Sequence, residues 1–581
     1  MKRIPILTTL LLGLLALAAC QKTDDAAPDG MVEIFAESMN GNGKVVLDGL
    51  SATWRSGDEI RINGTTATVK RREGHAYISS ATLQPTTNRA LYPASLEVAN
   101  WGTDNPVVTL PAYYHYRTDS SGHQVLDLPM AAYSTGDNPL QFKHLTGALY
   151  ITITNTASVP LTLQSVTVTS SNYQLSGTRN IDISTMSIEG SVYNSVDDKS
   201  VSLVFDKNLT LSAGSNVRVM VPVLPVGSNQ NFTIKVRSVG ENIANTYLYN
   251  RSQPNNGVDH SLQRNQLGYV PVSITAEESS SPLDQVNGAY VVRTPLEFCL
   301  MAQGITNSSI ADNATIEIME DINMSGYTVS PIVKTGFCGT IHGNNKRISN
   351  LTIGCVSCGT GLFTCSLFGC VGTPQISNLN LDGITLDYRS FVGNGTLYIG
   401  GLIGTQDAWD GTSTIENCGI HISSVRAGSP SGMVYFGGIM ADASKAVSIS
   451  NCNVSFTGLP PALTGRTVYF GGFIGYSGTN PTSITSSSLV GSCVRIEPSS
   501  GARVGGLIGN KGDGRVKATS CSVLDSVSVI GGSNLYCGTL FGYYAGRDTK
   551  ITEEGNNLDF KVSFNGNPVT IGRYNTSLTN N

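Results

Sequence analysis

The sequence predicts an all-β protein in which β-sandwiches are followed by a β-solenoid. Runs of alternating apolar and polar residues, the pattern of half-buried strands, recur across positions 31–275. Beyond them a glycine-rich motif repeats at offsets of 37, 34, 34 and 33 residues, and such a period marks a stacked repeat architecture. Charged residues make up 14% of the 581-residue chain, and 63 residues are glycine, which argues against long helices.

The charge balance excludes several classes of protein. Lys and Arg number 37 against 42 for Asp and Glu, which gives a net charge of -5. No large positive field is available to attract phosphates, so we expect no nucleic-acid partner. A hydrophobic fraction of 40% is too high for a mostly disordered chain.

The N-terminus predicts a lipoprotein. Lys2 and Arg3 precede an apolar run over 6–19, which is too short for a mature membrane-spanning helix. The run ends in Leu17-Ala18-Ala19-Cys20, which resembles the lipobox of bacterial lipoproteins. This resemblance implies that 1–19 is a signal peptide and that Cys20 carries the lipid. A plain signal peptide with an incidental cysteine is the alternative.

Residues 20–30 are predicted to be the lipidated cysteine and a flexible tether. Asp24 and Asp25 resemble the acidic surface-export signal of some Gram-negative lipoproteins. We therefore expect a protein anchored by its lipid in the outer membrane and exposed at the cell surface. A periplasmic tether is the alternative.

The first half is predicted to form two β-sandwich domains, over 31–145 and 146–275. Period-two alternation buries one face of each strand, which suits antiparallel sheets packed in pairs. No cysteine lies between Gln21 and Phe298, so packing alone must hold these domains. The predicted strands include Val32–Ala36, Leu149–Thr154, Leu161–Thr169, Val217–Val221 and Phe232–Val236.

Several motifs of this half resemble the fimbrillin-like proteins, the subunits of type V pili. Trp54–Ile60 matches a W-x-x-G-D-x-I signature, and Leu91–Pro93 and Gln263–Asn265 follow in that family's order. The resemblance implies transthyretin-like sandwiches made as a lipoprotein precursor. It also implies that an Arg-directed protease removes the first strand, whose groove then accepts a neighbour's strand. By position, Arg55 and Arg61 are candidate cleavage sites or else plain strand or turn residues.

A linker over 276–287 is predicted to connect the two halves. A strand over 288–293 follows it, and then a short helix over Leu296–Gln303. Thr294 can cap this helix, which has proline at its first position and Glu297 three residues past the cap. Such a helix can cover the exposed end of a solenoid.

The solenoid is predicted over 288–555, with 556–581 as a C-terminal cap or tail strand. Glycine at a tight corner permits a positive φ, and the aliphatic residue after it is expected to point into the core. Asn suits left-handed bends and can form a ladder with its neighbour about 4.8 Å away. The motif residues are Gly400, Gly401, Gly404, Gly437, Gly438, Gly471, Gly472, Gly475, Gly505, Gly506 and Gly509, with Asn417, Cys418, Asn451 and Cys452 in a second motif.

The repeat resembles the GLUG motif of bacterial surface proteins, and Phe337–Asn345 resembles that family's opening segment. This resemblance implies a right-handed parallel β-helix. The sequence leaves open whether one repeat forms one coil or two. The tail Leu558–Phe564 could be a donor strand, part of a hairpin or, as we expect, the final cap.

The cysteines are interpreted mainly as core residues. Cys418, Cys452 and Cys521 occupy equivalent repeat positions, which favours an inward-facing ladder. We expect no metal and no cofactor, and the disulfide state stays open. Four cysteines are close in sequence with a loose spacing that allows either a disulfide or a zinc site: Cys355, Cys358, Cys365 and Cys370.

No catalytic motif stands out, and we expect no enzyme. Paired carboxylates could perform acid–base chemistry on a β-helix, but solvated turn acids are the plainer interpretation of Asp382, Asp387, Asp407 and Asp410.

A tyrosine stripe is the second tempting feature. Tyr398, Tyr435 and Tyr469 each precede a Gly-Gly pair by two residues. Such a stripe could stack on sugar rings, or its members could pack against each other along a ladder.

The expected function is that of a non-enzymatic cell-surface adhesin, or of an accessory or tip subunit of a fimbrium. The sandwiches would assemble with other fimbrial subunits by strand exchange. The β-helix would present a face to a host or bacterial surface glycan or protein. The alternatives are a surface carbohydrate-active lyase or hydrolase, and a surface structural lipoprotein with no pilus role.

Overall fold

The computed structural model describes residues 28–37, 40–41, 54–120, 122, 124–136, 138–170, 173–188, 199–227, 232–239, 246–252, 261–274, 277–279, 281–407, 411–457, 462–491 and 494–579. Nearly all regular structure in these ranges is β-strand, which confirms the all-β prediction. Cys20, Asp24, Asp25 and Asp410 lie outside the described residues. Within the described ranges, no helix has the length and apolar character needed to cross a bilayer.

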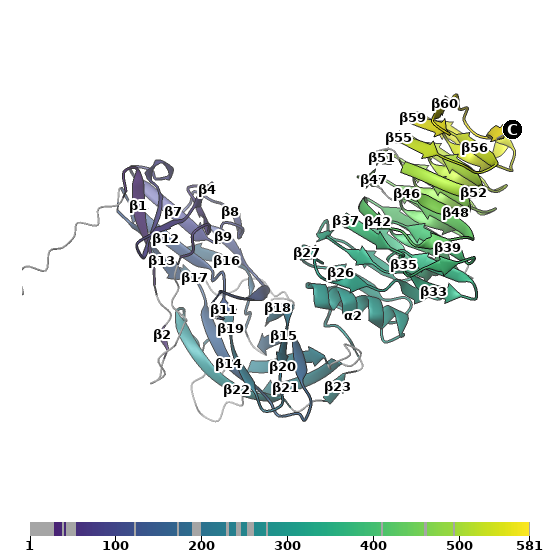
Figure 1. The fold of residues 1–581 in the computed structure, drawn as a ribbon. Helices are drawn as coiled ribbons and strands as arrows, with labels where there is room; N and C mark the ends of the chain where they lie inside the picture. Colours follow the sequence, from purple (N-terminus) through teal and green to yellow (C-terminus); the bar gives the residue numbers. More distant parts are fainter. Residues whose placement is uncertain are drawn as a thin grey trace, which may run out of the picture.

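The first sandwich pairs an eight-stranded sheet with a four-stranded one (Figure 1). Trp54 lies in a core that the strands of the larger sheet enclose, edge-on to the rings of Tyr92 and Phe142 at 5.0 and 4.9 Å. The larger sheet runs β4 (Thr65–Thr68), β3 (Glu59–Ile62), β7 (Thr87–Tyr92), β12 (Met130–Thr135), β13 (Leu140–His144), β1 (Met31–Ala36), β6 (His75–Ser79) and β5 (Lys70–Arg72). The smaller runs β17 (Ser187–Ile188), β16 (Gly177–Asp182), β9 (Val107–Leu110) and β8 (Glu97–Ala99).

The second sandwich packs a seven-stranded sheet on a four-stranded one. The five strands predicted from alternation in the two sandwiches are all present. One sheet runs β11 (Gln124–Val125), β10 (Tyr113–Thr118), β18 (Ser200–Leu211), β15 (Leu161–Ser170), β20 (Phe232–Val239), β21 (Thr246–Ser252) and β23 (Glu277–Ser279). The other runs β19 (Asn216–Val223), β14 (Gly147–Asn155), β22 (Gln266–Ile274) and β2 (Asn40–Gly41).

The two sandwiches exchange strands along the chain. β10, which precedes the second sandwich in sequence, pairs in parallel with β18 of that sandwich. In return, β16 pairs antiparallel with β9 of the first. The polypeptide therefore crosses between the sandwiches more than once, and each sandwich completes a sheet with a strand from the sequence region of the other.

The second half is a parallel β-solenoid built on three sheets. One sheet holds β24 (Gln285–Val286), β25 (Ala289–Val292), β26 (Thr315–Ile318), β30 (Thr340–His342), β36 (Gln375–Ser377), β41 (Thr412–Glu416), β46 (Ala446–Ser450), β50 (Thr482–Thr485), β54 (Val516–Thr519) and β58 (Ile551–Glu554). A second holds β29 (Ile332–Lys334), β35 (Phe368–Val371), β40 (Ile403–Gln406), β45 (Met440–Ala443), β49 (Ile474–Ser477), β53 (Ile508–Lys511) and β57 (Phe541–Tyr544).

The third sheet takes two strands from each full repeat. Its members include β37 (Asn380–Asp387), β39 (Thr396–Gly400), β42 (Gly419–Arg426), β44 (Met433–Gly437), β47 (Asn453–Phe456), β48 (Leu463–Gly471), β51 (Ser488–Val490), β52 (Val494–Gly505), β55 (Ser522–Val529) and β56 (Asn534–Gly538). Tyr398 of β39 pairs in register with Tyr435 of β44, one repeat later. One repeat therefore forms one coil.

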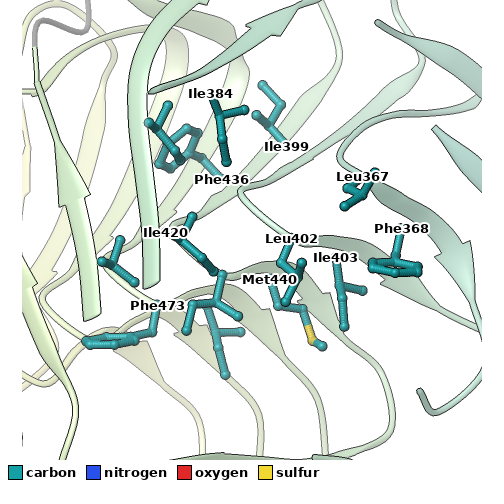
Figure 2. Packing of buried hydrophobic residues seen from close by; sticks show 14 of the residues in the cluster. Leu367, Phe368, Ile384, Ile399, Leu402, Ile403, Ile420, Phe436, Met440 and Phe473 are labelled. Carbon is teal, nitrogen blue, oxygen red and sulfur yellow. The ribbon is translucent and has the colours of Figure 1, made fainter. Parts of the chain in front are cut away.

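Apolar side chains fill the inside of the coils (Figure 2). The residue after each glycine pair points into this core, as predicted; Leu402, Ile439, Phe473 and Leu507 are all fully buried. Equivalent residues of successive coils lie one above another because the strands pair in register. Each coil thus covers the apolar face of its neighbours.

Both ends of the solenoid are covered (Figure 1). The helix α2 (Pro295–Thr306) lies at the near end, and the hydroxyl of Thr294 accepts a hydrogen bond from the Glu297 amide at 3.2 Å, as the capping pattern predicts. At the far end, β59 (Asn557–Phe564) stacks in parallel on β55. β60 (Asn567–Val569) then pairs antiparallel with β59, and β61 (Thr576–Thr579) pairs antiparallel with β56, so the tail forms both a last rung and a hairpin.

The segment between the halves is pinned by buried charges. Asp284 lies within 2.8 to 3.2 Å of Lys235 and Arg237 of β20 and of Arg293 before α2. Burial opposes ionisation, but these three cations outweigh it and lower the pKa of Asp284. Glu297 is buried as well and accepts hydrogen bonds from the Arg293 amide and side chain. The network ties the solenoid cap to the second sandwich.

Candidate functional site

The motif glycines permit close approach of the backbone between and within coils. A Cβ atom on Gly437 would overlap the carbonyl oxygen of Met440, and one on Gly438 would overlap the carbonyl oxygen of Gly472 in the next coil. The same holds for the equivalent positions: Gly400, Gly401, Gly471, Gly472, Gly505 and Gly506. A Cβ on Gly404, Gly475 or Gly509 would lie 2.3 to 2.7 Å from a carbonyl oxygen of the preceding coil.

These glycines do not adopt the positive φ that the sequence led us to expect. The left-handed positions are instead the asparagines, with φ of 54° at Asn417 and 52° at Asn451. Asparagine tolerates this conformation through its short polar side chain. Glycine is therefore required in the motif by the missing Cβ rather than by backbone torsion.

The residue after each left-handed turn points inward. Cys418 and Cys452 are buried, and their thiols donate to the carbonyl oxygens of Glu416 and Ser450, each at 3.2 Å. Cys521 occupies the same place two coils beyond Cys452. These cysteines belong to one inward-facing row along the solenoid, in which the buried Ser487 takes the place between Cys452 and Cys521.

A row of aromatic side chains follows one edge of the solenoid, where β39, β44, β48, β52 and β56 lie side by side. Tyr398, Tyr435, Tyr469, Arg503 and Tyr536 pair in register along these strands. Seven residues after each comes a second row on β40, β45, β49, β53 and β57: Thr405, Asp442, Tyr476, Asn510 and Tyr543. We call these ten residues the tyrosine edge.

The tyrosines of the first row stack on one another. The rings of Tyr398 and Tyr435 are 5.3 Å apart and those of Tyr435 and Tyr469 are 4.4 Å apart, each pair nearly parallel. Their faces are occupied by neighbouring rings, which supports ladder packing and leaves ring edges and hydroxyls for a ligand. Tyr476 meets Tyr435 edge to face at 5.7 Å.

Arg503 replaces tyrosine at the fourth position of the first row. Its guanidinium lies 5.2 Å from the ring centre of Tyr469, 4.4 Å from that of Tyr543 and 6.0 Å from that of Tyr536. Among the residues that the structure describes, the guanidinium has no hydrogen-bond or ion-pair partner. Cation–π contacts hold it in place and leave its N–H groups open.

Asp442 is the acid of the tyrosine edge. One oxygen, Oδ2, accepts hydrogen bonds from Thr405 at 3.2 Å and Ser444 at 3.0 Å. The other, Oδ1, is buried and has no hydrogen-bond partner in the part of the chain that the structure describes. Burial raises the pKa of Asp442 to about 6. The carboxyl group therefore gains or loses its proton near pH 6 and not near its ordinary pKa of 3.8.

One of the acids considered in the sequence forms a polar chain on another face. Asp382 Oδ1 lies 2.8 Å from His421 Nδ1, and His421 Nε2 lies 2.6 Å from the hydroxyl of Thr457. Arg347 also approaches Asp382 at 3.7 Å. Such a chain can orient an imidazole as a general base. Asp387, by contrast, pairs with Arg389 at 2.7 Å.

The clustered cysteines form no disulfide in this structure. The thiols of Cys358 and Cys370 hydrogen-bond to each other, which lowers the pKa of Cys358 and raises that of Cys370. Cys355 is half-buried and Cys365 is fully enclosed. Over the described part of the chain, no group of three or more His, Cys, Asp or Glu side chains could hold a metal ion.

The two arginines named as cleavage candidates differ in accessibility. Arg61 lies inside β3, between β4 and β7, and donates to the carbonyl oxygen of Ala94 at 2.7 Å. Arg55 precedes β3 in a turn with 41% of its side chain exposed, and it pairs with Asp58 and Asp127. Only Arg55 lies outside the hydrogen-bonded sheet.

The sequence identified part of the tyrosine edge and missed the rest. Tyr398, Tyr435 and Tyr469 were visible from their place before the glycine pair. Arg503 and Tyr536 occupy the same place, and extending the motif to every repeat would have found them. The second row could have been found from its constant spacing of seven residues. That the second row contacts the first could not be predicted, because the contact depends on how the chain turns between the two strands of each coil.

Comparisons with known proteins give a likeness at low identity. No protein-family model matches the chain, and neither does any curated protein. Similar crystal structures include candidate cell adhesion proteins from Bacteroides ovatus (15% identity, TM-score 0.26, 42% of this chain, 95% of that chain), Bacteroides uniformis (15%, 0.24, 43%, 96%) and Bacteroides fragilis (12%, 0.26, 42%, 92%). The chain is thus similar to proteins of this description over 42–43% of its length.

Proposed function

We propose that this protein is a non-enzymatic cell-surface adhesin whose sandwiches attach it and whose solenoid presents the tyrosine edge to a ligand. The observation that carries the proposal is the edge itself, which is fixed on stacked coils: four tyrosines and an arginine in the first row and two further tyrosines in the second. The arginine has no ion-pair partner among the described residues. Rigid aromatic and arginine side chains are the residues that dominate binding surfaces. The buried charges around Asp284 support it further, because they tie the solenoid cap to the second sandwich. The half that attaches the protein is thereby connected to the half that presents the tyrosine edge.

Binding by the chain without its predicted signal peptide and lipid cysteine tests this proposal. The protein beginning at Gln21 is applied to a glycan array, together with Tyr476→Ala, which removes a partly exposed ring of the edge. Tyr150→Ala is the matched control, since Tyr150 makes a similar edge-on contact with Tyr269 at 5.6 Å in the sandwich. We expect Tyr476→Ala to weaken binding and Tyr150→Ala to leave it unchanged. Equal binding by all three proteins, or none by the wild type to glycans or surface proteins, contradicts it.

Assembly into a fimbrium by strand exchange is the finer proposal, and the position of β1 supports it. β1 lies between β13 and β6, with Ile34 buried at 2% exposure. Cleavage after Arg55 would separate β1 from the rest of the chain and leave a groove in the sheet. Another subunit could fill that groove by β-augmentation.

Treatment with an Arg-specific protease followed by gel filtration tests strand exchange. We expect oligomers from the wild type and from Arg117→Gln, and a monomer from Arg55→Gln. Arg117 is a matched control because its side chain is 51% exposed and also pairs with Asp127. Oligomers that form without cleavage at Arg55, or a monomer after complete cleavage there, would rule the scheme out and leave a surface protein with no pilus role.

The lipid anchor at Cys20 is proposed from the sequence and gives the protein its place at the outer membrane. Cys20→Ala should move the protein from the membrane fraction to the soluble fraction and abolish labelling by palmitate. Unchanged fractionation of this variant would contradict the anchor. Protease accessibility in intact cells then distinguishes the cell surface from the periplasm.

A carbohydrate-active enzyme is the second candidate, and the chain Asp382–His421–Thr457 favours it. His421 could act there as a general base on a bound polysaccharide. The assay measures new reducing ends from acidic and neutral polysaccharides, with His421→Ala as the test. His342→Ala is the control, because His342 also bonds a hydroxyl on a solenoid strand, Ser377 at 3.1 Å. Activity lost only in His421→Ala would establish this alternative.

A further inference from the structure

We infer that the tyrosine edge recognises a carboxylated glycan and that Arg503 binds the carboxylate. This inference rests on the adhesion function proposed above and names the class of its ligand. The first step is the position of Arg503: it is partly exposed on β52 and surrounded by the rings of Tyr469, Tyr536 and Tyr543. Three ring contacts fix a side chain that would otherwise lose much rotamer freedom on binding.

The second step is the unused hydrogen-bonding capacity of that guanidinium. An arginine presents five N–H donors in a planar fork that matches a carboxylate. In the described ranges no protein carboxylate pairs with Arg503. The acid of the edge, Asp442, belongs to another coil and bonds to Thr405 and Ser444 instead. Arg495, on the same strand, shows the contrast, because its side chain is paired with Glu497.

The third step is the surrounding chemistry, which favours a glycan over an acidic peptide. The hydroxyls of Tyr398, Tyr476, Tyr536 and Tyr543 have no hydrogen-bond partner among the described residues. These tyrosines lie on the first, third and fifth coils of the edge. Because successive coils are about 4.8 Å apart, an extended sugar chain along the solenoid can reach them in turn. A peptide strand would instead need an open sheet edge, whereas these strands are paired on both sides.

The test uses the full chain and four immobilised probes. Polygalacturonate carries one carboxylate on each sugar, and its methyl ester has the same backbone with the charge removed. Dextran is the neutral glycan, and polyglutamate is the acidic peptide. The variants are Arg503→Gln, Arg503→Lys, Tyr476→Ala and the control Arg495→Gln, whose side chain is 57% exposed on the same strand as Arg503. Thermal unfolding of each variant verifies that it is folded.

We expect the wild type to bind polygalacturonate at least about tenfold more tightly than its methyl ester, since one charge-assisted hydrogen-bond pair is worth that much or more. Arg503→Gln should remove this preference, Arg503→Lys should restore part of it, and Arg495→Gln should retain it. Added salt should weaken binding to the acid and leave binding to the ester unchanged.

Several results would overturn the inference. Equal affinity for acid and ester, a preference retained by Arg503→Gln, or no binding to polygalacturonate each refutes recognition of a carboxylated glycan. Stronger binding to polyglutamate assigns the site to an acidic peptide. Binding to dextran that depends on Tyr476 but not on Arg503 refutes this inference and leaves the adhesion proposal standing. If Tyr476→Ala binds every probe and every array glycan as tightly as the wild type does, both proposals are refuted.

Discussion

The guanidinium of Arg293 lies 2.8 Å from a carboxylate oxygen of Asp284, with 1% and 10% of the two side chains exposed. Arg237 meets the other oxygen of the same carboxylate at 3.2 Å. One acid thus joins a strand of the second sandwich to the residue that precedes the solenoid cap. Removing one member of such a buried network is costly, because it leaves the remaining charges buried without their full compensation.

Asp284→Ala should therefore destabilise the protein strongly. The substitution leaves Arg237 and Arg293 buried with one fewer carboxylate, and breaking a buried pair typically costs about 3–5 kcal/mol. Chemical unfolding measures the effect. Asp312→Ala is the control, since Asp312 is 43% exposed and lies 3.5 Å from Lys334. An equally small loss from both substitutions would show that the buried network contributes little.

Gly472→Ala should disrupt the stack of coils. Its Cβ would overlap the carbonyl oxygen of Gly506, which belongs to the backbone and cannot rotate away. Overpacking of this kind typically costs about 1–3 kcal/mol, and backbone overlap belongs at the upper end. Gly354→Ala is the control, because the nearest atom to its Cβ would be 3.8 Å away. Thermal unfolding that shifts equally in both variants would contradict the close-approach role.

Ser520→Asn should stabilise the solenoid. Ser520 has a φ of 55°, and Asn451 takes the same place with a φ of 52°. A left-handed residue costs about 1–2 kcal/mol in general, and asparagine lowers that cost. We expect a gain of up to about 1 kcal/mol and a higher unfolding temperature. Conversely, Asn451→Val should destabilise the solenoid, because valine is β-branched and tolerates a positive φ poorly. A valine variant as stable as the wild type would argue against strain at this turn.

Asp442→Asn should remove a pH dependence of stability. Because the folded protein holds the proton of Asp442 up to a pH of about 6, above its ordinary value of 3.8, stability should fall as pH rises between these values and stay level above. The difference of about two pKa units corresponds to about 3 kcal/mol. Asp442→Asn should match the wild type near pH 4 and exceed it at pH 8.

The control for this pH profile is Asp559→Asn, which changes an acid that is 51% exposed and paired with Lys561. We expect its unfolding midpoint to follow that of the wild type at every pH. If the unfolding midpoint of Asp442→Asn also follows that of the wild type at every pH, the pKa of Asp442 is not raised in the folded protein.

The sequence by itself determined the strands, the repeat and the cap. Alternation over Leu161–Thr169, the glycine pairs such as Gly437-Gly438, and the Thr294 cap are local patterns, and each depends on sterics or hydrogen bonds within a few residues. The backbone torsion at the turns was not predicted from these local patterns. The glycine pairs were expected to have a positive φ, but Asn417 and Asn451 have it instead.

Only the tertiary structure decided which side chains meet. Arg503 lies on three rings from other coils, Asp382 finds His421 one repeat later, and Asp284 joins residues of both halves. Such contacts depend on the register between coils and on the fold-back after each glycine pair. Register is set by the summed packing of the whole core, so no short stretch of sequence specifies it.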